Sequence, residues 1–224
     1  MRIGVIGAGR IGGNCARQAV NGGHQVKLSF ARDPSNLERL AANLGDRAST
    51  GTVADAVAFA ELLILSVPWG VIPDALSQAG ALDGKIVIDT TNQFGPGPMP
   101  EPAQTAASFN AQRLPGARYV KSFNTLTSQF QEQAADRKGD ERVVQWVCGD
   151  DLHAKQQAAR LIEDMNYVPV DLGGTGTCAV MEAPRRVGSV YGEEYRLADA
   201  PAVVEAVRRG EAIPPTPEYP EASD

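Results

Sequence analysis

A glycine-rich turn near the N-terminus constrains the fold of this chain more than any other sequence feature. Residues 2–6 form a short apolar run, and Gly7, Gly9 and Gly12 follow it with the spacing G-x-G-x-x-G. From about residue 11, apolar side chains recur on one face with helical spacing. A strand, a glycine turn and a helix in this order predict the first unit of a parallel α/β sheet.

Apolar runs and helical patterns continue to alternate up to residue 171. The sequence predicts strands at 2–6, 25–30, 48–52, 62–67, 85–89, 119–123, 143–148 and 168–171, and helices near 11–21, 37–44, 53–60, 73–80 and 154–165. Strands that alternate with helices form a mainly parallel sheet with helices on both faces. We therefore expect an α/β fold with a doubly wound sheet, whose ligand crevice lies at the carboxyl ends of the strands.

The chain divides into two expected regions. Residues 1–172 form a dinucleotide-binding domain of the Rossmann type, and residues 173–224 form a small C-terminal cap or extension with a poorly ordered, proline-rich tail from about residue 213. The segment 173–191 carries apolar residues that need burial, namely Val180, Met181, Val187 and Val190. We expect this segment to fold over the carboxyl end of the sheet or to exchange with a second subunit of a homodimer.

Each glycine of the turn has a separate role in dinucleotide binding. Gly7 permits the tight turn, Gly9 lets the backbone approach a pyrophosphate, and Gly12 lets the helix pack closely on the strand. The N–H groups and the dipole of the helix N-terminus then hold the anion. The alternative is a glycine-rich turn without a ligand, but the position after the first strand favours a dinucleotide.

The end of the second predicted strand distinguishes the two nicotinamide cofactors. Proteins that bind NAD place an Asp or Glu there to accept hydrogen bonds from the ribose 2′-hydroxyl. This chain has Ser29 and Arg32 at that place, and no acid before Asp33. A hydroxyl and a guanidinium can bind a 2′-phosphate, which a carboxylate would repel. The sequence therefore favours NADP(H), with a merely solvated Arg32 as the alternative.

Three further strand ends carry distinctive sequences. Ser66-Val67-Pro68-Trp69 follows the fourth predicted strand, Ile88-Asp89-Thr90-Thr91-Asn92 the fifth, and Val120-Lys121-Ser122-Phe123-Asn124-Thr125-Leu126 the sixth. With the glycine turn and the Ser29 and Arg32 pair, these motifs make the chain resemble the NADP oxidoreductases that depend on coenzyme F420, together with their relatives of unassigned substrate. The resemblance covers roughly residues 1–175.

The resemblance implies a set of cofactor-binding residues. The pyrophosphate would lie against Gly7, Ala8, Gly9, Arg10, Ile11 and Gly12, and the 2′-phosphate against Ser29 and Arg32, beside Phe30. Ser66, Val67, Pro68 and Ile72 would lie near the adenosine and ribose, and Asn92 would approach the nicotinamide. We place a second substrate near Asn124 and Met181.

Hydride transfer between two rings requires alignment more than acid–base groups. The chain is therefore expected to be an NADPH-dependent oxidoreductase, and no catalytic residue is assigned. Its small-molecule acceptor is a deazaflavin such as F420, a flavin or a small carbonyl compound. The alternative is an NADP(H)-binding regulatory or redox-sensing module without turnover. Such a module can dispense with an acceptor pocket that faces the nicotinamide.

The sequence leaves two alternative roles open for several ionisable residues. Asp89 could act as an acid or bind its own turn, and Lys121 could meet a ligand or form a structural ion pair. Arg185 and Arg186 could receive an anionic substrate or be solvated. The two histidines, His24 and His153, are expected to be structural or solvated.

Composition excludes several other classes of protein. A net charge of −6 and a pI near 5.0 disfavour a nucleic-acid partner, which selects basic surfaces. The cysteines Cys15, Cys148 and Cys178 are odd in number and widely spaced, so we expect buried thiols, a reducing cytoplasm and no metal site. The most apolar stretch, residues 53–72, contains Asp55 and Glu61, so no membrane association is expected.

Overall fold

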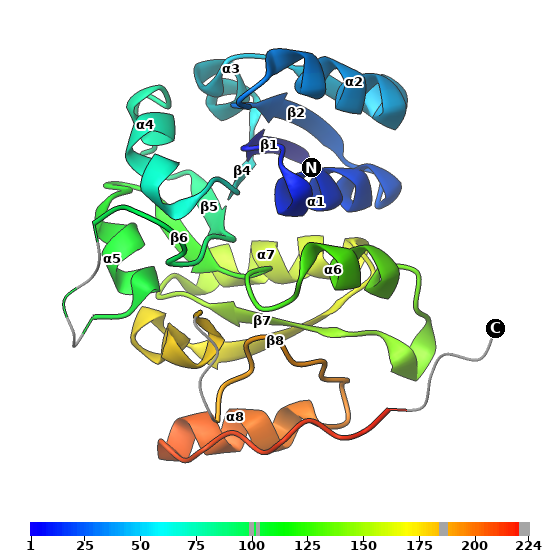
Figure 1. Cartoon of the computed structure of the whole chain (residues 1–224), viewed down its shortest axis with the longest axis vertical. Helices are drawn as coiled ribbons and strands as arrows, with labels where there is room; N and C mark the ends of the chain where they lie inside the picture. Colours follow the sequence, from blue (N-terminus) through cyan, green and yellow to red (C-terminus); the bar gives the residue numbers. More distant parts are fainter. Residues whose placement is uncertain (99–100, 102–103, 184–187, 220–224) are drawn as a thin grey trace.

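The computed structural model of the chain describes residues 1–98, 101, 104–183 and 188–219. In these residues eight strands form one sheet in the order β3-β2-β1-β4-β5-β6-β7-β8 (Figure 1). The strands are β1 Arg2–Ile6, β2 Gln25–Ser29, β3 Ala48–Thr50, β4 Leu62–Leu65, β5 Ile86–Asp89, β6 Arg118–Lys121, β7 Val144–Cys148 and β8 Val168–Gly173. Strands β1 to β6 are parallel, β7 runs antiparallel to β6, and β8 is parallel to β7. The predicted doubly wound, mainly parallel sheet is confirmed.

Helices cover both faces of this sheet (Figure 1). Their bounds are α1 Arg10–Asn21, α2 Pro34–Leu44, α3 Val53–Phe59, α4 Ile72–Ser77, α5 Ala106–Gln112, α6 Ser128–Ala134, α7 Leu152–Asp164 and α8 Ala200–Arg209, with short 3₁₀ segments η1 Gly45–Arg47, η2 Trp69–Val71, η3 Gly139–Glu141 and η4 Thr175–Met181. One apolar core joins the sheet to α1, α2, α6 and α7, and the other joins it to α3, α4, α5, η4 and α8. Sequence patterns missed α5, α6 and α8.

The central strands are buried on both faces, which explains their continuous apolar sequences. All four residues of β4 are buried, because side chains on either face meet a helix layer. The three cysteines are also fully buried, as expected. Burial raises the pKa of the Cys15 thiol to about 12, so this side chain packs as a small apolar group.

Four predicted strands, β2, β3, β4 and β6, end earlier than the sequence suggested, and two of them end near a phenylalanine in an unusual conformation. Phe30 and Phe123 follow β2 and β6 with φ angles of 58° and 57°, in the left-handed region that strands do not use. The ring of Phe123 packs edge-on against Tyr167 with centroids 6.1 Å apart. Tertiary packing therefore holds a backbone conformation that costs a non-glycine residue roughly 1–2 kcal/mol. The chain turns sharply at both strand ends.

The C-terminal region packs on the sheet rather than apart from it. Segment η4 lies against α5 and the ends of β6, β7 and β8, and α8 packs on β8. The sequence predicted a poorly ordered tail from residue 213, but its described part makes defined contacts: Ile213 is buried, and the Tyr219 hydroxyl donates to Asp199 over 2.5 Å. Residues 220–224 of the tail lie outside the described residues.

Two glycines, Gly7 and Gly12, allow the turn after β1, the start of α1 and the residue after β4 to pack closely together. Gly7 has a φ of 98°, and a Cβ there would lie 2.4 Å from the backbone oxygen of Ser66. A Cβ on Gly12 would lie 2.0 Å from the backbone oxygen of Gly7. Neither position admits a side chain, so the expected roles of Gly7 in the turn and of Gly12 in helix packing are both met.

We expect Gly12→Ala to destabilise the protein by about 1–3 kcal/mol or more, because the new methyl group forces α1 away from the turn. Chemical denaturation would measure the free energy of unfolding. Gly13→Ala is the matched control, since its Cβ would lie 3.6 Å from Leu40, an ordinary contact. That variant should be unchanged or more stable by up to about 1 kcal/mol. Equal losses in both variants would contradict the packing role of Gly12.

Candidate functional site

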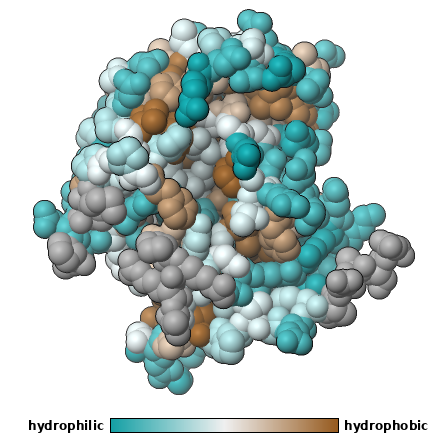
Figure 2. Space-filling view, viewed as in Figure 1, coloured by the Kyte–Doolittle hydropathy of each residue, from teal (hydrophilic) through white to brown (hydrophobic). Residues whose placement is uncertain are grey.

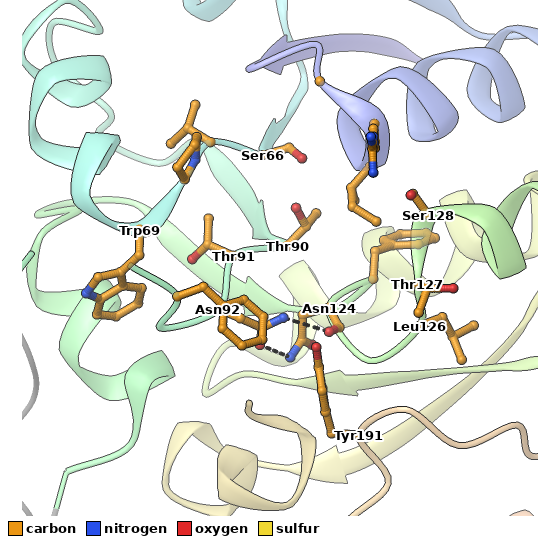
Figure 3. A pocket seen from close by; sticks show the side chains of 17 residues that line it. Ser66, Trp69, Thr90, Thr91, Asn92, Asn124, Leu126, Thr127, Ser128 and Tyr191 are labelled. Carbon is orange, nitrogen blue, oxygen red and sulfur yellow. Dashed lines mark hydrogen bonds between the residues drawn. The ribbon is translucent and has the colours of Figure 1, made fainter. Parts of the chain in front are cut away.

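A cleft of about 550 Å³ opens at the carboxyl ends of β1, β4, β5 and β6 (Figure 3). It is lined by residues from five segments of the chain: Gly9, Arg10, Ile11, Ser66, Val67, Pro68, Trp69, Thr90, Thr91, Asn92, Phe94, Phe123, Asn124, Leu126, Thr127, Ser128 and Tyr191. In the space-filling view, apolar side chains lie in and around the central hollow of this face (Figure 2). The cleft includes the point between β1 and β4 where the strand order reverses, which is where open α/β sheets bind ligands.

The glycine turn leaves room for a ligand at one position only. Helix α1 begins after Gly9, no described side chain caps its first turn, and this turn contains no acid. A Cβ on Gly9 would meet no described atom within 4 Å, whereas Gly7 and Gly12 are crowded. The N–H groups of the first turn are therefore accessible to an anion. Arg10 and Ile11 line the cleft beside them, and Ala8 is half-buried in the turn.

The end of β2 presents Arg32 and not Ser29. Ser29 is fully buried, and its hydroxyl donates a hydrogen bond to the backbone oxygen of Val5 over 3.0 Å. The predicted contact between Ser29 and a 2′-phosphate is wrong in this geometry, because the strand holds the hydroxyl inside the core. Arg32 is exposed after the half-buried Phe30. The Asp33 carboxylate accepts from the backbone N–H of Ser35 over 3.0 Å and so caps α2.

The segment after β4 forms one wall of the cleft. Ser66, Val67 and Pro68 line it as predicted, but Ile72 has no exposed surface and belongs to the core beneath α4. Ile72 therefore supports this wall from behind and does not contact a ligand. Trp69 is buried as well, and its indole N–H donates to the backbone oxygen of Pro98 over 2.7 Å. The tryptophan thus fixes the neighbouring loop.

Two asparagines join the ends of β5 and β6 by reciprocal hydrogen bonds (Figure 3). The Asn92 amide donates to the backbone oxygen of Asn124 over 2.8 Å, and the Asn124 amide donates to Asn92 Oδ1 over 3.1 Å. Asn124 also donates to the backbone oxygen of Met181 over 2.7 Å. Both asparagines line the cleft, but the Met181 side chain is fully buried. Met181 was expected to contact substrate; it serves instead as a backbone acceptor that ties η4 to the site.

Behind this wall lies a fully buried ion pair. Asp89 Oδ2 accepts from Lys121 Nζ over 3.2 Å, from the Tyr119 hydroxyl over 2.5 Å and from the Asn110 amide over 2.9 Å. Asp89 Oδ1 accepts from the backbone N–H of Thr91 over 2.7 Å, and Lys121 also donates to the Thr91 backbone oxygen. Two roles were open for each of these residues. The structure supports the structural role of both: Asp89 binds its own turn, and Lys121 forms an ion pair with Asp89.

The surroundings of Asp89 and Tyr119 determine whether each side chain is protonated at neutral pH. Burial raises the pKa of the Asp89 carboxyl, but the Lys121 ammonium and the donated hydrogen bonds outweigh it and hold the pKa below its usual value. Burial, together with the Asp89 carboxylate, raises the pKa of Tyr119 well above its usual value. Asp89 is therefore ionised at neutral pH and Tyr119 is protonated. Neither group is exposed to the cleft.

A buried glutamate connects η4 to α5. The Glu182 carboxylate accepts from the backbone N–H groups of Ala106 and Ala107, each over 2.9 Å. The first turn of this helix would otherwise lack partners for these N–H groups. Sequence analysis missed this contact, because Glu182 and α5 are separated by some 75 residues without a shared pattern.

The remaining predicted groups do not join the cleft. His24 accepts from the N-terminal ammonium over 2.9 Å and lies 3.1 Å from Asp164, and His153 is exposed on α7. Arg185 and Arg186 lie outside the described residues. Within the described ranges, no group of histidine, cysteine or acidic side chains could hold a metal ion. The described helices include none with the length and apolarity to cross a bilayer.

We expect Asp89→Asn to destabilise the protein by about 3–5 kcal/mol at neutral pH, because it leaves the Lys121 ammonium buried without a counter-ion. Since folding lowers the pKa of Asp89, its stabilising effect is present above the unfolded-state value of about 3.9 and is lost as the pH falls through the folded-state value. The difference between the two proteins should therefore shrink in acid. Urea denaturation at several pH values would measure it.

The control for this experiment is Asp46→Asn, at an exposed position. It should change the free energy of unfolding by less than about 0.5 kcal/mol. A stable Asp89→Asn protein with unchanged pH dependence would contradict the structural role of the ion pair.

Residues 2–93 of the chain match the family of NADP oxidoreductases that depend on coenzyme F420, which confirms the resemblance inferred from the motifs. The chain is 28% identical over 182 residues to metalloreductase STEAP3 of Rattus norvegicus, covering 81% of this chain and 36% of that protein. It is 24% identical over 180 residues to metalloreductase STEAP2 of Mus musculus, covering 80% and 35%. The chain spans about a third of the length of these relatives.

Several solved structures share the fold of this chain. A hypothetical protein from Sinorhizobium meliloti superposes with a TM-score of 0.77 at 25% identity, covering 88% of this chain and 95% of that one. A proposed F420-dependent NADP reductase from Arthrobacter sp. FB24 gives a TM-score of 0.65 at 27% identity, covering 80% and 87%. An imine reductase from Myxococcus stipitatus in complex with NAD⁺ shares the fold, with a TM-score of 0.59 at 20% identity over 78% of this chain and 55% of that one.

Proposed function

We propose that this chain, whose residues 2–93 match the coenzyme F420-dependent NADP oxidoreductases, binds NADP(H) at its glycine turn and uses it to reduce a small-molecule acceptor. The observation that carries the proposal is the open space at Gly9, above the uncapped first turn of α1 and between β1 and β4. A pyrophosphate needs accessible N–H groups and a residue without a side chain at this place.

Arg32 supports NADP(H) over NAD(H). Its side chain is exposed just after β2, where a 2′-phosphate would lie, and the carboxylate of the next residue, Asp33, caps α2. A guanidinium can form paired, charge-assisted hydrogen bonds with a phosphate. We assign the 2′-phosphate to Arg32 alone, since the buried hydroxyl of Ser29 already donates to the backbone of β1.

The remaining cleft residues orient the nicotinamide half of the cofactor and the acceptor. NADPH supplies a hydride when it is bound. Val67 and Pro68 offer an apolar wall for the ribose, and Asn92 and Asn124 hold the opposite wall rigid through their reciprocal hydrogen bonds. A cleft that continues from Gly9 to Tyr191 favours turnover over the alternative of a sensing module. A deazaflavin such as F420, a flavin or a small carbonyl compound would enter there. The homodimer and the cytoplasmic location stay predictions from the sequence.

We expect the protein to bind NADPH more tightly than NADH, and Arg32→Ala to remove most of this preference. The loss of NADPH affinity should be about 10–100-fold, from about 1.5–3 kcal/mol for a charged hydrogen bond, while NADH affinity barely changes. Fluorescence titration measures both. Arg208→Ala removes an exposed arginine of α8 and should leave both affinities unchanged. Equal weakening of both cofactors by Arg32→Ala would remove the basis for NADP(H).

The Gly9→Ala variant should weaken NADPH and NADH together by at least about 10-fold, because the methyl group occupies the space proposed for the shared pyrophosphate. The folded protein itself has room for this methyl group, so the thermal midpoint without ligand should not fall. Gly176→Ala is the control, since its Cβ also meets no described atom within 4 Å but lies on η4. Unchanged binding by Gly9→Ala would contradict the proposed site.

A further inference from the structure

Tyr191 brings a phenol into the proposed cofactor cleft from the C-terminal segment. Its side chain lines the cleft, and Figure 3 shows it beside Asn92 and Asn124 and across the cleft from Ser66. The ring is half-buried and packs at a tilt against Phe94, with centroids 6.3 Å apart. The match to the F420-dependent family covers residues 2–93 and so does not include this residue.

Backbone contacts on both sides fix the position of Tyr191. The preceding residue, Val190, is fully buried, and its N–H donates to the backbone oxygen of Val180 over 2.9 Å. The following residue, Gly192, donates to the backbone oxygen of Thr125 over 2.7 Å. The phenol is thus carried on a short segment anchored to η4 and to the loop after β6. A positioned side chain of this kind can act on a bound molecule.

Ionisable groups are scarce in the cleft. Among its described lining residues, only Arg10 and Tyr191 carry an ionisable side chain. Asp89 and Lys121 neutralise each other behind the wall without exposed surface, and Glu182 caps α5. An arginine stays charged at any ordinary pH and does not release its proton. Among the described residues that line this cleft, Tyr191 is therefore the side chain that can supply a proton.

We propose that the Tyr191 hydroxyl donates the proton in the reduction of a small carbonyl compound by NADPH. This inference rests on the proposed function and narrows its acceptor to one chemical class. As the hydride forms the new C–H bond at the carbonyl carbon, the C=O π pair moves to oxygen. That oxygen takes the Tyr191 proton to complete the alcohol, and water returns a proton to the phenolate. NADPH is oxidised to NADP⁺, and the carbonyl is reduced.

The surroundings of Tyr191 keep its proton in place. Burial raises the pKa of this phenol, so it is protonated at neutral pH and available as a donor. The acids on its own segment are engaged elsewhere: Glu193 accepts from Thr216, and Glu194 pairs with Arg137 and Arg196. Arg10 faces the same cleft from α1.

Tyr191→Phe removes only the hydroxyl and keeps the ring that packs on Phe94. We expect it to lower kcat for NADPH oxidation with 4-nitrobenzaldehyde, and with a panel of aliphatic aldehydes and ketones, by about 10²-fold or more. The Kd for NADPH, measured by fluorescence, should stay within about two-fold. Tyr219→Phe, which removes a hydroxyl far along the chain that bonds Asp199, is the matched control and should retain full kcat.

The pH dependence gives two further readouts. In the wild type, kcat should fall only as the pH rises through the raised pKa of Tyr191, above about 10, because the phenolate has no proton to donate. This decrease of kcat at high pH should be absent in the Tyr191→Phe variant. Without any acceptor, the ultraviolet titration of the wild type minus that of Tyr191→Phe should show one phenol that ionises above pH 10.

The possible outcomes separate the two proposals. Failure of the wild type to bind NADPH would defeat the proposed function itself. Binding of NADPH without reduction of any carbonyl in the panel, or with reduction of a flavin or deazaflavin only, would overturn the assignment to Tyr191 and leave the cofactor site standing. An unchanged kcat in Tyr191→Phe, or a phenol that ionises below neutral pH, would overturn it as well.

Discussion

The buried ion pair of Asp89 and Lys121 is the interaction on which the rest of the candidate site depends. Two opposite charges without solvent are stable only when each finds its partner and further hydrogen bonds. Here the two strand ends that carry them, β5 and β6, lie side by side in the sheet, in register from Ile86 with Arg118 to Asp89 with Lys121. The Thr91 backbone forms hydrogen bonds with both charged side chains: its N–H donates to Asp89, and its oxygen accepts from Lys121. The ion pair therefore fixes where the chain leaves β5 and forms the cleft wall.

The same network extends into the second layer of helices. Asn110 of α5 donates to Asp89, and the first turn of α5 is capped by Glu182. Segment η4 is thus attached to the sheet through α5, and to the end of β6 through Asn124 and Met181. Tyr191 follows on the anchored segment after η4. A chain of hydrogen-bonded buried polar groups consequently sets the geometry of a site whose own lining is mostly neutral.

Sequence reasoning predicted the strands, the helices α1, α2, α3, α4 and α7 and the glycine turn, but it misassigned three of the residues expected to contact ligands. Ser29 ends β2, Ile72 begins α4 and Met181 ends η4, and the side chains of all three are buried in the core. The misassignment of Ser29 has a simple physical reason. Residues next to each other at a strand end face opposite sides of the sheet, and the sharp turns at Phe30 and Phe123 alter this alternation. The side on which such a residue falls is not visible in its local sequence.

The amino-acid sequence by itself determined the first unit of the fold and the place that we propose for a dinucleotide. This is because Gly7, Gly9 and Gly12 mark a tight turn from a strand into a helix, and their spacing within six residues can be recognised without knowing that Gly7 also packs against Ser66. Only the tertiary structure decided which of the predicted side chains reach the cleft, and it added Tyr191 to them. Tyr191, Asn92 and Asn124 come from segments far apart in the chain, and packing of the C-terminal segment across the ends of β5 and β6 brings them together. Such contacts depend on burial and on long-range hydrogen bonds, which leave no periodic signal in a sequence.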